Sequence, residues 1–325
     1  MSSLNTNIAA MTALQTLNQT NQDMLDTQNR ISTGMRVRDA SDNAAYWSIA
    51  TTMRSDNMAV STVADALGLG AATVEVAITA MNNTIETVSK IKAKLTAARA
   101  PGLDRAKIQS EIVALQQELK SAADSAVFSG QNWLVGDGSL LPEELIKTIV
   151  SSFSRDSEGQ ITIGTIELDV SGYDDTDPLN PTSGTMLFDS SGSGNGILDT
   201  EHDVTTSGSS ISSFSIYELD ISGITDDPDE LDALVEIIGI VDKSHELMTD
   251  AATLLGAAKS RINLQKDFVD KLMDSIDVGV GQLVDADMNE ESTRLQALQV
   301  RQQLGVQALG IANQSAQQIL RLFQQ

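Results

Sequence analysis

The chain has 325 residues with a formal net charge of −24, no cysteine and only 3% aromatic residues. The absence of cysteine excludes disulfides, thiolate metal sites and cysteine nucleophiles. The negative charge argues strongly against nucleic-acid binding, because it would repel the phosphates. The length suits one large domain or a few small ones, and the scarcity of large rings favours cores of aliphatic residues along helix seams.

The start of the sequence, MSSLNTNIAA, lacks the basic residues and the continuous apolar run of a cleavable signal peptide. No run of about 18 apolar residues occurs, so we expect no membrane-spanning helix. If the protein is extracellular, we expect it to leave the cell by a route that needs no such signal.

The N-terminal segment predicts an amphipathic helix of unusual composition. Residues 1–22 contain no charged side chain, and Asn, Gln, Ser and Thr fill the face opposite the apolar one. A solvated monomeric helix usually carries charge on its outer face, whereas an uncharged polar face suits helices packed in register against many copies of themselves. The apolar stripe consists of Leu4, Ile8, Met11, Leu14 and Leu17.

A long heptad pattern follows between Tyr46 and Leu95, where apolar or small residues recur at alternating spacings of three and four. The segment from Ala100 to Gly102, with a central proline, ends this predicted helix. The same spacing between Ile108 and Ala122 predicts a second helix.

The middle of the chain reads as a separate acidic unit. Residues 137–232 hold 21 acidic residues against only Lys147 and Arg155, and four of the five prolines lie there. Period-two alternation predicts strands at 161–170 and 214–221, and helical spacing predicts a helix at 140–153. We therefore expect a small α+β domain with long surface loops.

The C-terminal side repeats the heptad pattern from Leu231 to Ile276. Matching seams from opposite ends of the chain predict a mainly α fold, in which both ends form an elongated antiparallel helical bundle or coiled coil. Residues 302–320 again lack charged side chains. Their stripe begins upstream and consists of Leu295, Leu298, Leu309, Ala312, Ala316, Ile319 and Phe323, with Gln302 and Gly305 in register. The residues alone thus favour a self-assembling rod, and an intramolecular pair of terminal helices in a monomer stays open.

No catalytic, cofactor or metal site is predicted. His245 begins an HELMT segment that lacks the second histidine of a zinc-protease motif, so packing on the seam is the better interpretation. The segment 189–199 has alternating oxygen ligands around glycines but lacks the glutamate of a calcium loop. A solvated acidic loop is the default there and at 174–177.

Short segments near both ends of the chain carry a family resemblance. They are ISTGMRV from Ile31 to Val37 and ASDNAA from Ala40 to Ala45 near one end, and DMNEE at 287–291, ALGIANQ at 308–314 and ILRLF at 319–323 near the other. The first two segments resemble the N-terminal signature of bacterial flagellins, and the last three resemble the C-terminal signature. The resemblance covers about residues 1–135 and 230–325, in the style of alphaproteobacterial flagellins.

Three departures from the family pattern stand out. Arg38 replaces a usual asparagine, Tyr46 and Trp47 replace a glycine–leucine pair, and Ala316 replaces a proline, so the last helix is expected to run unbroken.

The resemblance implies a structural subunit that self-polymerises into the bacterial flagellar filament for swimming motility. It implies export of the unfolded chain through the flagellar type III apparatus and an extracellular location. Implied partners are other copies of itself, other flagellins, an export chaperone, the filament cap and hook–filament junction proteins, with no cofactor, nucleic acid or membrane.

The same resemblance implies a division of the chain into five parts. Residues 1–42 would form a filament-core helix and a spoke, 43–135 and 231–284 the two halves of a bundle, 136–230 a variable surface domain, and 285–325 a second core helix. The spoke would include Gly34, Arg36, Arg38, Asp42 and Asn43.

Immune receptors read flagellin surfaces, and this chain departs from the recognised segments. In the segment read by the animal receptor, Thr87 and Ser89 stand where the family has arginines and Lys90 where it has a glutamate, beside Glu86 and Val88. The segment recognised by plants corresponds to about residues 29–50 and is also altered. Loss of charge-assisted contacts predicts poor detection by both.

Three other functions remain as alternatives. A hook–filament junction protein resembles flagellin at both ends but forms a single ring. A surface adhesin would use the acidic middle domain to bind a receptor or cations. An enzyme in that domain is disfavoured by only two histidines and no catalytic motif.

Overall fold

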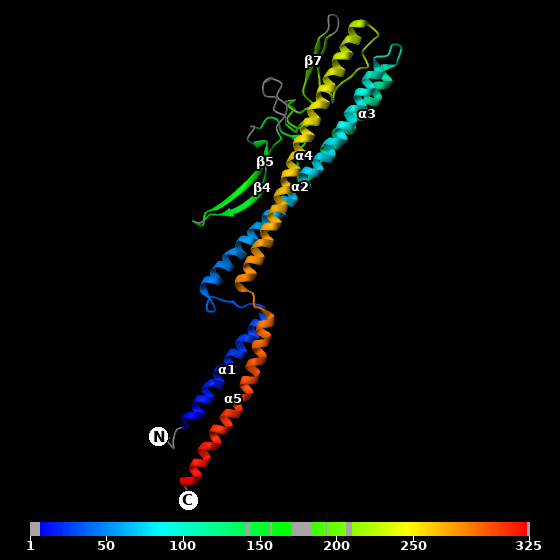
Figure 1. The fold of residues 1–325 in the computed structure, drawn as a ribbon. Coiled ribbons are helices and arrows are strands. Elements are labelled where there is room, and N and C mark those ends of the chain that lie inside the picture. Colours follow the sequence, from blue (N-terminus) through cyan, green and yellow to red (C-terminus); the bar gives the residue numbers. More distant parts are fainter. Residues whose placement is uncertain are drawn as a thin grey trace. The chain divides into compact units, whose positions relative to one another are not determined.

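The computed structural model describes residues 7–140, 144–156, 158–170, 184–192, 194–205 and 210–323, with only the backbone for 205, 210–213 and 315–323. The chain forms two compact units, one made of residues 1–58 with 272–325 and the other of residues 59–271. Helical chain ends around a small α+β middle confirm the expected fold class (Figure 1). The helices are α1 (Ile8–Thr33), α2 (Ala44–Ala98), α3 (Arg105–Asp124), α4 (Pro228–Val284) and α5 (Met288–Phe323).

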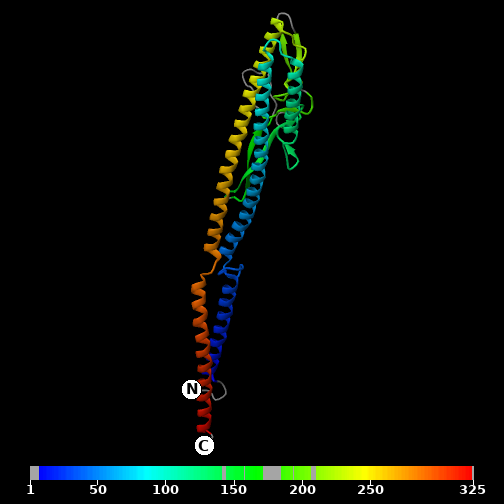
Figure 2. The same cartoon turned by 90° about the vertical axis from the view of Figure 1, so that its right-hand side faces the viewer.

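In the first unit, α1 and α5 lie side by side and antiparallel, as both ribbon views show (Figures 1 and 2). Asn7 caps the start of α1 through its side-chain oxygen, and its amide Nδ2 donates to the Ala312 carbonyl at 2.9 Å. Further along the pair, Gln302 donates to Asn21 at 2.8 Å. α5 runs unbroken past Ala316, as expected from the missing proline.

The second unit contains most of α2, the whole of α3 and most of α4. α2 and α4 run antiparallel, with ion pairs between Glu75 and Lys259 and between Lys92 and Asp242. Most of their heptad positions are buried or half-buried, and the helices predicted within 46–95, 108–122 and 231–276 are confirmed. Fully buried members of this core include Leu67, Met81, Ile91, Leu95, Ile112, Leu119, Leu234, Val241, Leu255 and Ile262.

Among the described residues, α2 is the helix whose length and composition would allow it to cross a membrane. In its most apolar window, 39% of the residues are buried within the structure. A core helix passes the same length and composition test, and the heptad seam of α2 supplies the core of the second unit.

In the middle of the chain, the described residues form four two-stranded sheets. β1 (Val127–Phe128) pairs antiparallel with β2 (Gln131–Asn132), and β3 (Val135–Gly136) pairs parallel with β6 (Phe188–Asp189). β4 (Ile146–Arg155) and β5 (Ile161–Asp169) form the longest hairpin, and β7 (His202–Thr205) pairs antiparallel with β8 (Ser210–Phe214). The strand predicted at 161–170 is therefore confirmed.

The helix predicted at 140–153 is wrong. Leu145 and Ile149 have helical spacing, but Ile149 pairs with Ile166 across the hairpin, and residues 141–143 lie outside the described residues. The β-branched residues from Ile146 to Val150 favour the strand, and the pairing partner satisfies their backbone.

The strand predicted at 214–221 is also wrong beyond Phe214, where β8 ends. This buried segment lies along α3, and two glutamine side chains of α3 serve its backbone. Gln109 donates to the Leu219 carbonyl and accepts from the Ile221 N–H, while Gln116 donates to the carbonyls of Ile216 and Leu219. Side chains, rather than a neighbouring strand, satisfy the buried polar groups.

Candidate assembly site

The facing sides of α1 and α5 make a thin seam. α1 contributes mostly alanine and threonine, with Leu17 half-buried, while α5 contributes Leu298, which is buried. A Cβ on Gly305 would lie 3.2 Å from Leu17 Cδ1, so the two helices approach closely there. The less exposed positions include Ala10, Ala13, Leu17, Thr20, Met24 and Thr27 on α1, and Leu295, Leu298, Gln302, Gly305, Leu309 and Ala312 on α5.

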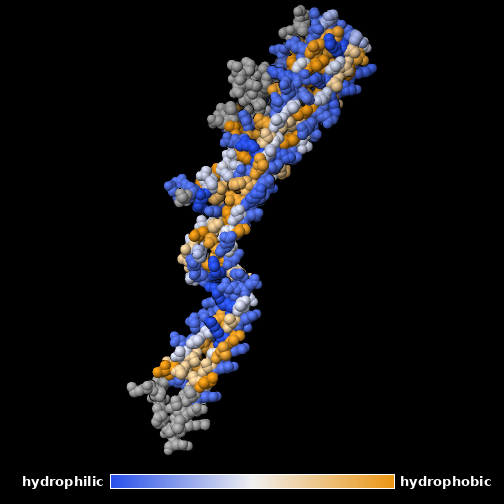
Figure 3. Space-filling model, in the orientation of Figure 1, coloured by the Kyte–Doolittle hydropathy of each residue, from blue (hydrophilic) through white to orange (hydrophobic). Residues whose placement is uncertain are grey.

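Both terminal helices carry a second apolar stripe that faces away from this seam. On α1, Ile8 is 65% exposed and Met11 63%, and Leu14 is also exposed. The space-filling view shows hydrophobic surface, in orange, along the part of the molecule that holds α1 and α5 (Figure 3). The outward stripe of α5 consists of Val300, Leu304 and Ile311, all exposed. The large apolar residues of α1 and α5 therefore divide between the seam and open surface.

The sequence-predicted packing residues fall on different faces. Leu17, Leu295, Leu298, Leu309 and Ala312 lie on the facing sides of the helix pair. Ile8, Met11 and Leu14 lie on the outward stripe. Leu4 lies outside the described residues, as do the side chains of Ala316, Ile319 and Phe323.

A short segment connects α1 to α2 within the first unit. Gly34 ends α1 in the left-handed conformation, with φ of 71°, which favours glycine. Met35 then forms a β-bridge with Asp285, and the Arg36 N–H donates to the Val284 carbonyl at 2.7 Å. The Arg36 side chain donates to the Leu283 carbonyl at 3.2 Å. The connection is thus held by the end of α4.

The remaining spoke residues shape the entry into α2. The Asp42 carboxylate accepts the N–H groups of Arg38 at 2.9 Å and Asp39 at 3.4 Å. The Asn43 side chain accepts the N–H groups of Ala45 and Tyr46, and so caps α2. Hydrogen bonds from the side chain and backbone of Ser41 lower the pKa of Asp39. These bonds fix the direction in which α2 begins.

Apolar packing supports the same connection. Val37 is buried with Ala50 from α2 and with Val280 and Val284 from α4. The sequence predicts the polar spoke residues, but it gives no packing role to Val37 or Asp285, because nothing local in the sequence marks a contact between such distant segments.

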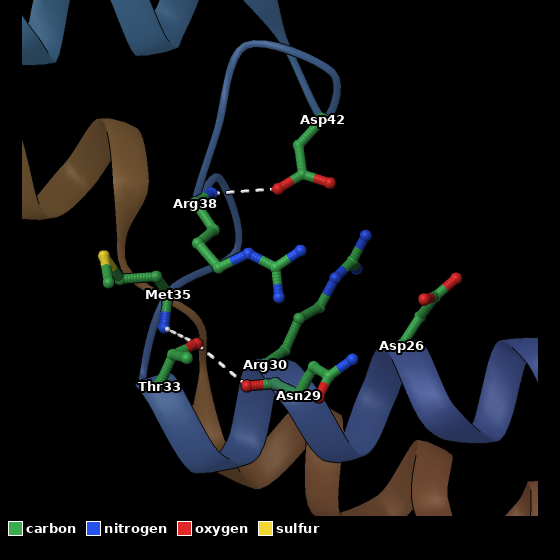
Figure 4. A pocket seen from close by; sticks show the side chains of 7 residues that line it. All are labelled: Asp26, Asn29, Arg30, Thr33, Met35, Arg38 and Asp42. Atoms are coloured by element: carbon green, nitrogen blue, oxygen red, sulfur yellow. Dashed lines mark hydrogen bonds between the residues drawn. The ribbon is translucent and has the colours of Figure 1, made fainter.

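The connecting segment borders a small pocket of about 80 Å³ (Figure 4). The guanidinium groups of Arg30 and Arg38 point toward one another inside it, and Asp26 and Asp42 stand at its rim. Arg30 also pairs with Glu291 of α5 at 3.3 Å. The pocket is therefore lined by both positively and negatively charged side chains.

Glu291 is a buried carboxylate between two arginines. Its side chain is only 6% exposed, and Oε1 pairs with Arg30 at 3.3 Å and Arg294 at 3.2 Å. In the sequence, Glu291 stands out only as part of the DMNEE motif at 287–291. A signal was available, because charged residues are rare on these helices and Glu291 precedes the Leu295 seam position by one turn.

In the segment 86–90 of α2, the structure separates buried residues from exposed ones. Thr87 and Val88 are buried, and the Thr87 hydroxyl donates to the Asn83 carbonyl. Ser89 is exposed, and Lys90 pairs with Glu86 at 3.0 Å, which raises the pKa of Lys90. A protein that approaches this part of α2 would therefore meet Glu86, Ser89 and Lys90 rather than Thr87.

The acidic loop at 189–199 is closed by its own hydrogen bonds. Asp189 accepts the N–H groups of Gly138 and Ser191, both at 2.8 Å. The Asp199 carboxylate accepts the Asp189 N–H at 2.6 Å. In the described part of the chain, no three His, Cys, Asp or Glu residues come together in a way that could hold a metal ion. Residues 174–177 lie outside the described residues.

Two long helical chain ends with outward-facing large apolar side chains are typical of a structural protein that assembles with other chains. Family models agree with this class. The model of the bacterial flagellin N-terminal helical region matches residues 4–139, and that of the C-terminal helical region matches residues 238–323.

Full-length relatives extend the likeness across the middle. The chain is 47% identical to Flagellin C of Rhizobium meliloti (strain 1021), with 100% of both chains covered. It is 44% identical to a flagellin of Brucella melitensis biotype 1, with 99% of each covered, and 41% identical to Flagellin A of Rhizobium meliloti (strain 1021), with 99% of this chain and 100% of the relative covered.

The chain belongs to the bacterial flagellin family, of the alphaproteobacterial type, and is a structural subunit of a flagellar filament.

Proposed function

We propose that the outward stripes of α1 and α5 are the contacts through which copies of the chain polymerise. The observation that carries this is the exposure of Ile8, Met11 and Leu14 on one helix and of Val300 and Leu304 on the other. Removing large apolar side chains from water lowers the free energy, and neighbouring copies of the chain can cover them. The uncharged polar residues around them avoid repeated like-charge contacts in a polymer.

We propose the same roles for the individual segments as the family resemblance implies. Residues 1–42 and 285–325 form the filament core and spoke, 43–135 and 231–284 the bundle, and 136–230 the acidic surface. The core-packing set includes Leu4, Ala316, Ile319 and Phe323 beside the residues on the described faces. Gly34, Arg36, Arg38, Asp42 and Asn43 hold the spoke, supported by their bonds to each other and to the end of α4.

Export follows from membership of the family. We propose that the unfolded chain leaves the cell through the flagellar type III apparatus, with help from an export chaperone. It then folds at the filament tip beside cap and junction proteins and remains extracellular, without catalytic activity of its own. Deletion of the export apparatus should keep the chain inside the cell, and its continued appearance in the medium would contradict this route.

Seeded polymerisation tests the assembly proposal. Purified chain with short filament seeds should grow into long filaments under the electron microscope, and sedimentation gives the critical concentration. Met11→Lys places a charge on the outward stripe and should raise that concentration about tenfold or more, because a buried unpaired charge is costly. Val113→Lys is the matched control, since Val113 is exposed on α3, which belongs to the other compact unit.

Two outcomes would overturn the proposal. Equal critical concentrations for the Met11 and Val113 variants would show that the outward stripe takes no part in assembly. Closed rings from wild-type chain would instead favour the hook–filament junction function, which ends in a ring rather than a filament.

We also propose weak detection by the animal receptor, because the exposed residues of its segment are Glu86, Ser89 and Lys90 rather than arginines. Thr87 and Val88 are buried and so contribute little to contact. Ser89→Arg should increase receptor activation by purified monomer, since an exposed arginine can make charge-assisted hydrogen bonds. Strong activation by the wild-type monomer would refute the proposal.

A further inference from the structure

The first two turns of α2 expose three large apolar side chains. Tyr46 is 42% exposed, Trp47 38% and Ile49 49%. We call these three residues the α2 start patch. Aromatic residues make up only 3% of the chain, and the other tryptophan, Trp133, is only 5% exposed. Tyrosine and tryptophan are enriched at the energetic centres of protein interfaces.

The patch is exposed because α2 extends past the helix that covers it. Asn57 of α2 lies against Asp277 of α4, with 2.6 Å between Nδ2 and Oδ1. Two turns earlier in α2, Ala50 packs in a cluster with Val284, the last residue of α4. Tyr46 is the next seam position toward the start of α2, one turn before Ala50, and α4 has already ended at that level. The apolar seam of α2 therefore continues beyond its intramolecular partner.

The surroundings of the patch carry both charges. Arg38, Asp42 and Arg54 are exposed beside it in sequence. A uniformly basic rim would suit a nucleic acid or an anionic membrane, whereas an apolar centre with a mixed polar rim is the usual anatomy of a protein–protein interface.

We propose that the α2 start patch is covered by a second copy of the chain in the filament. An open helical polymer needs contacts between two different surfaces of the subunit, and this patch lies in the same compact unit as the outward stripes of α1 and α5. The proposal rests on filament formation, but it assigns a contact to residues outside those stripes and outside the spoke.

The two tryptophans make the contact measurable. Trp133→Phe leaves Trp47 as the single tryptophan, and the protein is compared as monomer and as seeded filament. In the monomer, iodide should quench the fluorescence readily. In the filament, emission should shift to the blue and the quenching constant should fall about threefold or more, because burial excludes a charged quencher. Trp47→Phe leaves the buried Trp133 and should show no comparable change.

A second measurement does not depend on fluorescence. Tyr46→Ala with Trp47→Ala should raise the critical concentration about tenfold or more, as expected for loss of aromatic anchors. Leu69→Ala is the matched control, because Leu69 is exposed on α2 in the second unit.

The outcomes separate this contact from polymerisation itself. Filaments in which Trp47 is quenched as readily as in the monomer would overturn the contact and leave the assembly proposal standing. A double variant that polymerises as the Leu69 control does would also overturn the contact. Wild-type chain that forms no filaments at all would refute both proposals.

Discussion

Gly305 of α5 lies directly against Leu17 of α1, where an added Cβ would stand 3.2 Å from Leu17 Cδ1. Gly310, on the same helix, has nothing within 4 Å of its Cβ position. Replacing either glycine by leucine should gain about 0.8–1 kcal/mol of helix propensity, but at position 305 the crowding should cost about 1–3 kcal/mol.

In thermal melting followed by far-UV circular dichroism, the melting temperature of Gly310→Leu should therefore lie above that of the wild type. The melting temperature of Gly305→Leu should lie below that of Gly310→Leu. Equal melting temperatures for the two variants would mean that α1 and α5 do not approach closely at this point in solution.

Glu291 should stabilise the terminal helix pair through its two arginines. Glu291→Gln keeps the volume of the side chain but leaves Arg30 and Arg294 without their shared carboxylate. We expect a loss of about 1–2 kcal/mol, at the low end for a buried pair because both arginines reach solvent. Hydrogen exchange of the α1 amides around Arg30 should accelerate accordingly.

Glu290→Gln is the control, because Glu290 is 66% exposed and pairs with Arg294 at 2.9 Å on the surface. Its effect should stay below about 0.5 kcal/mol. A control variant that accelerates exchange as much as Glu291→Gln would contradict the special role of the buried carboxylate.

Gln109 should hold the segment 216–221 onto α3. Gln109→Leu leaves the Ile221 N–H without its acceptor and removes one of two donors to the Leu219 carbonyl. We expect a cost of about 2–3 kcal/mol in the free energy of unfolding, measured by chemical denaturation. Gln117→Leu on the exposed side of α3 should change it by less than about 0.5 kcal/mol. Similar losses for both would point to α3 propensity instead.

Asp199 and Asp189 should give opposite pH dependences. Burial and the nearby Asp189 charge raise the pKa of Asp199. The folded state therefore holds this proton more tightly than the unfolded chain, whose aspartates titrate near about 3.9. Stability is then lost as the pH rises from that value through the raised pKa of Asp199. Asp199→Asn should remove this loss and keep an acceptor for the Asp189 N–H.

For Asp189, burial acts to raise the pKa, but hydrogen bonds from Ser191, Gly138 and Asn195 outweigh it and lower the pKa. Its contribution is present above about pH 3.9 and disappears as the pH falls through the lowered pKa. The denaturation midpoint of each variant should be measured between about pH 3 and 7. At neutral pH, we expect the midpoint of Asp199→Asn to lie above that of the wild type and the midpoint of Asp189→Asn to lie below it. Parallel profiles would refute the assignment.

The long helices were predictable because their signal is local. Heptad positions such as Leu67, Met81 and Leu255 are large and apolar, and the same residues are buried in the second unit. The seam on α5 was also readable, since Leu295, Leu298 and Leu309 mark it. On α1, however, the face toward α5 consists mostly of alanine and threonine, which carry little periodic signal. The apolar stripe that the sequence does display faces outward there.

The segment 214–221 and the spoke were harder to predict, for a different reason. Period-two alternation at 214–221 describes a strand equally well, and only Gln109 and Gln116, about a hundred residues away, decide otherwise. In the same way, Gly34 is recognisable as a helix end, but its neighbours bond to Val284 and Asp285. Contacts between distant segments leave no trace in local spacing.

Between α1 and α5, leucines on α5 face mostly alanine and threonine on α1, so we expect the seam to hold the two chain ends together only weakly in a free subunit. A free subunit therefore offers a poor template to another free subunit, because neither presents a rigid surface. A filament end, where these helices are already ordered by their neighbours, offers a good one. Growth from an existing filament end should accordingly be much faster than spontaneous nucleation. The thin seam would thus influence where new filaments begin as well as how stable they are.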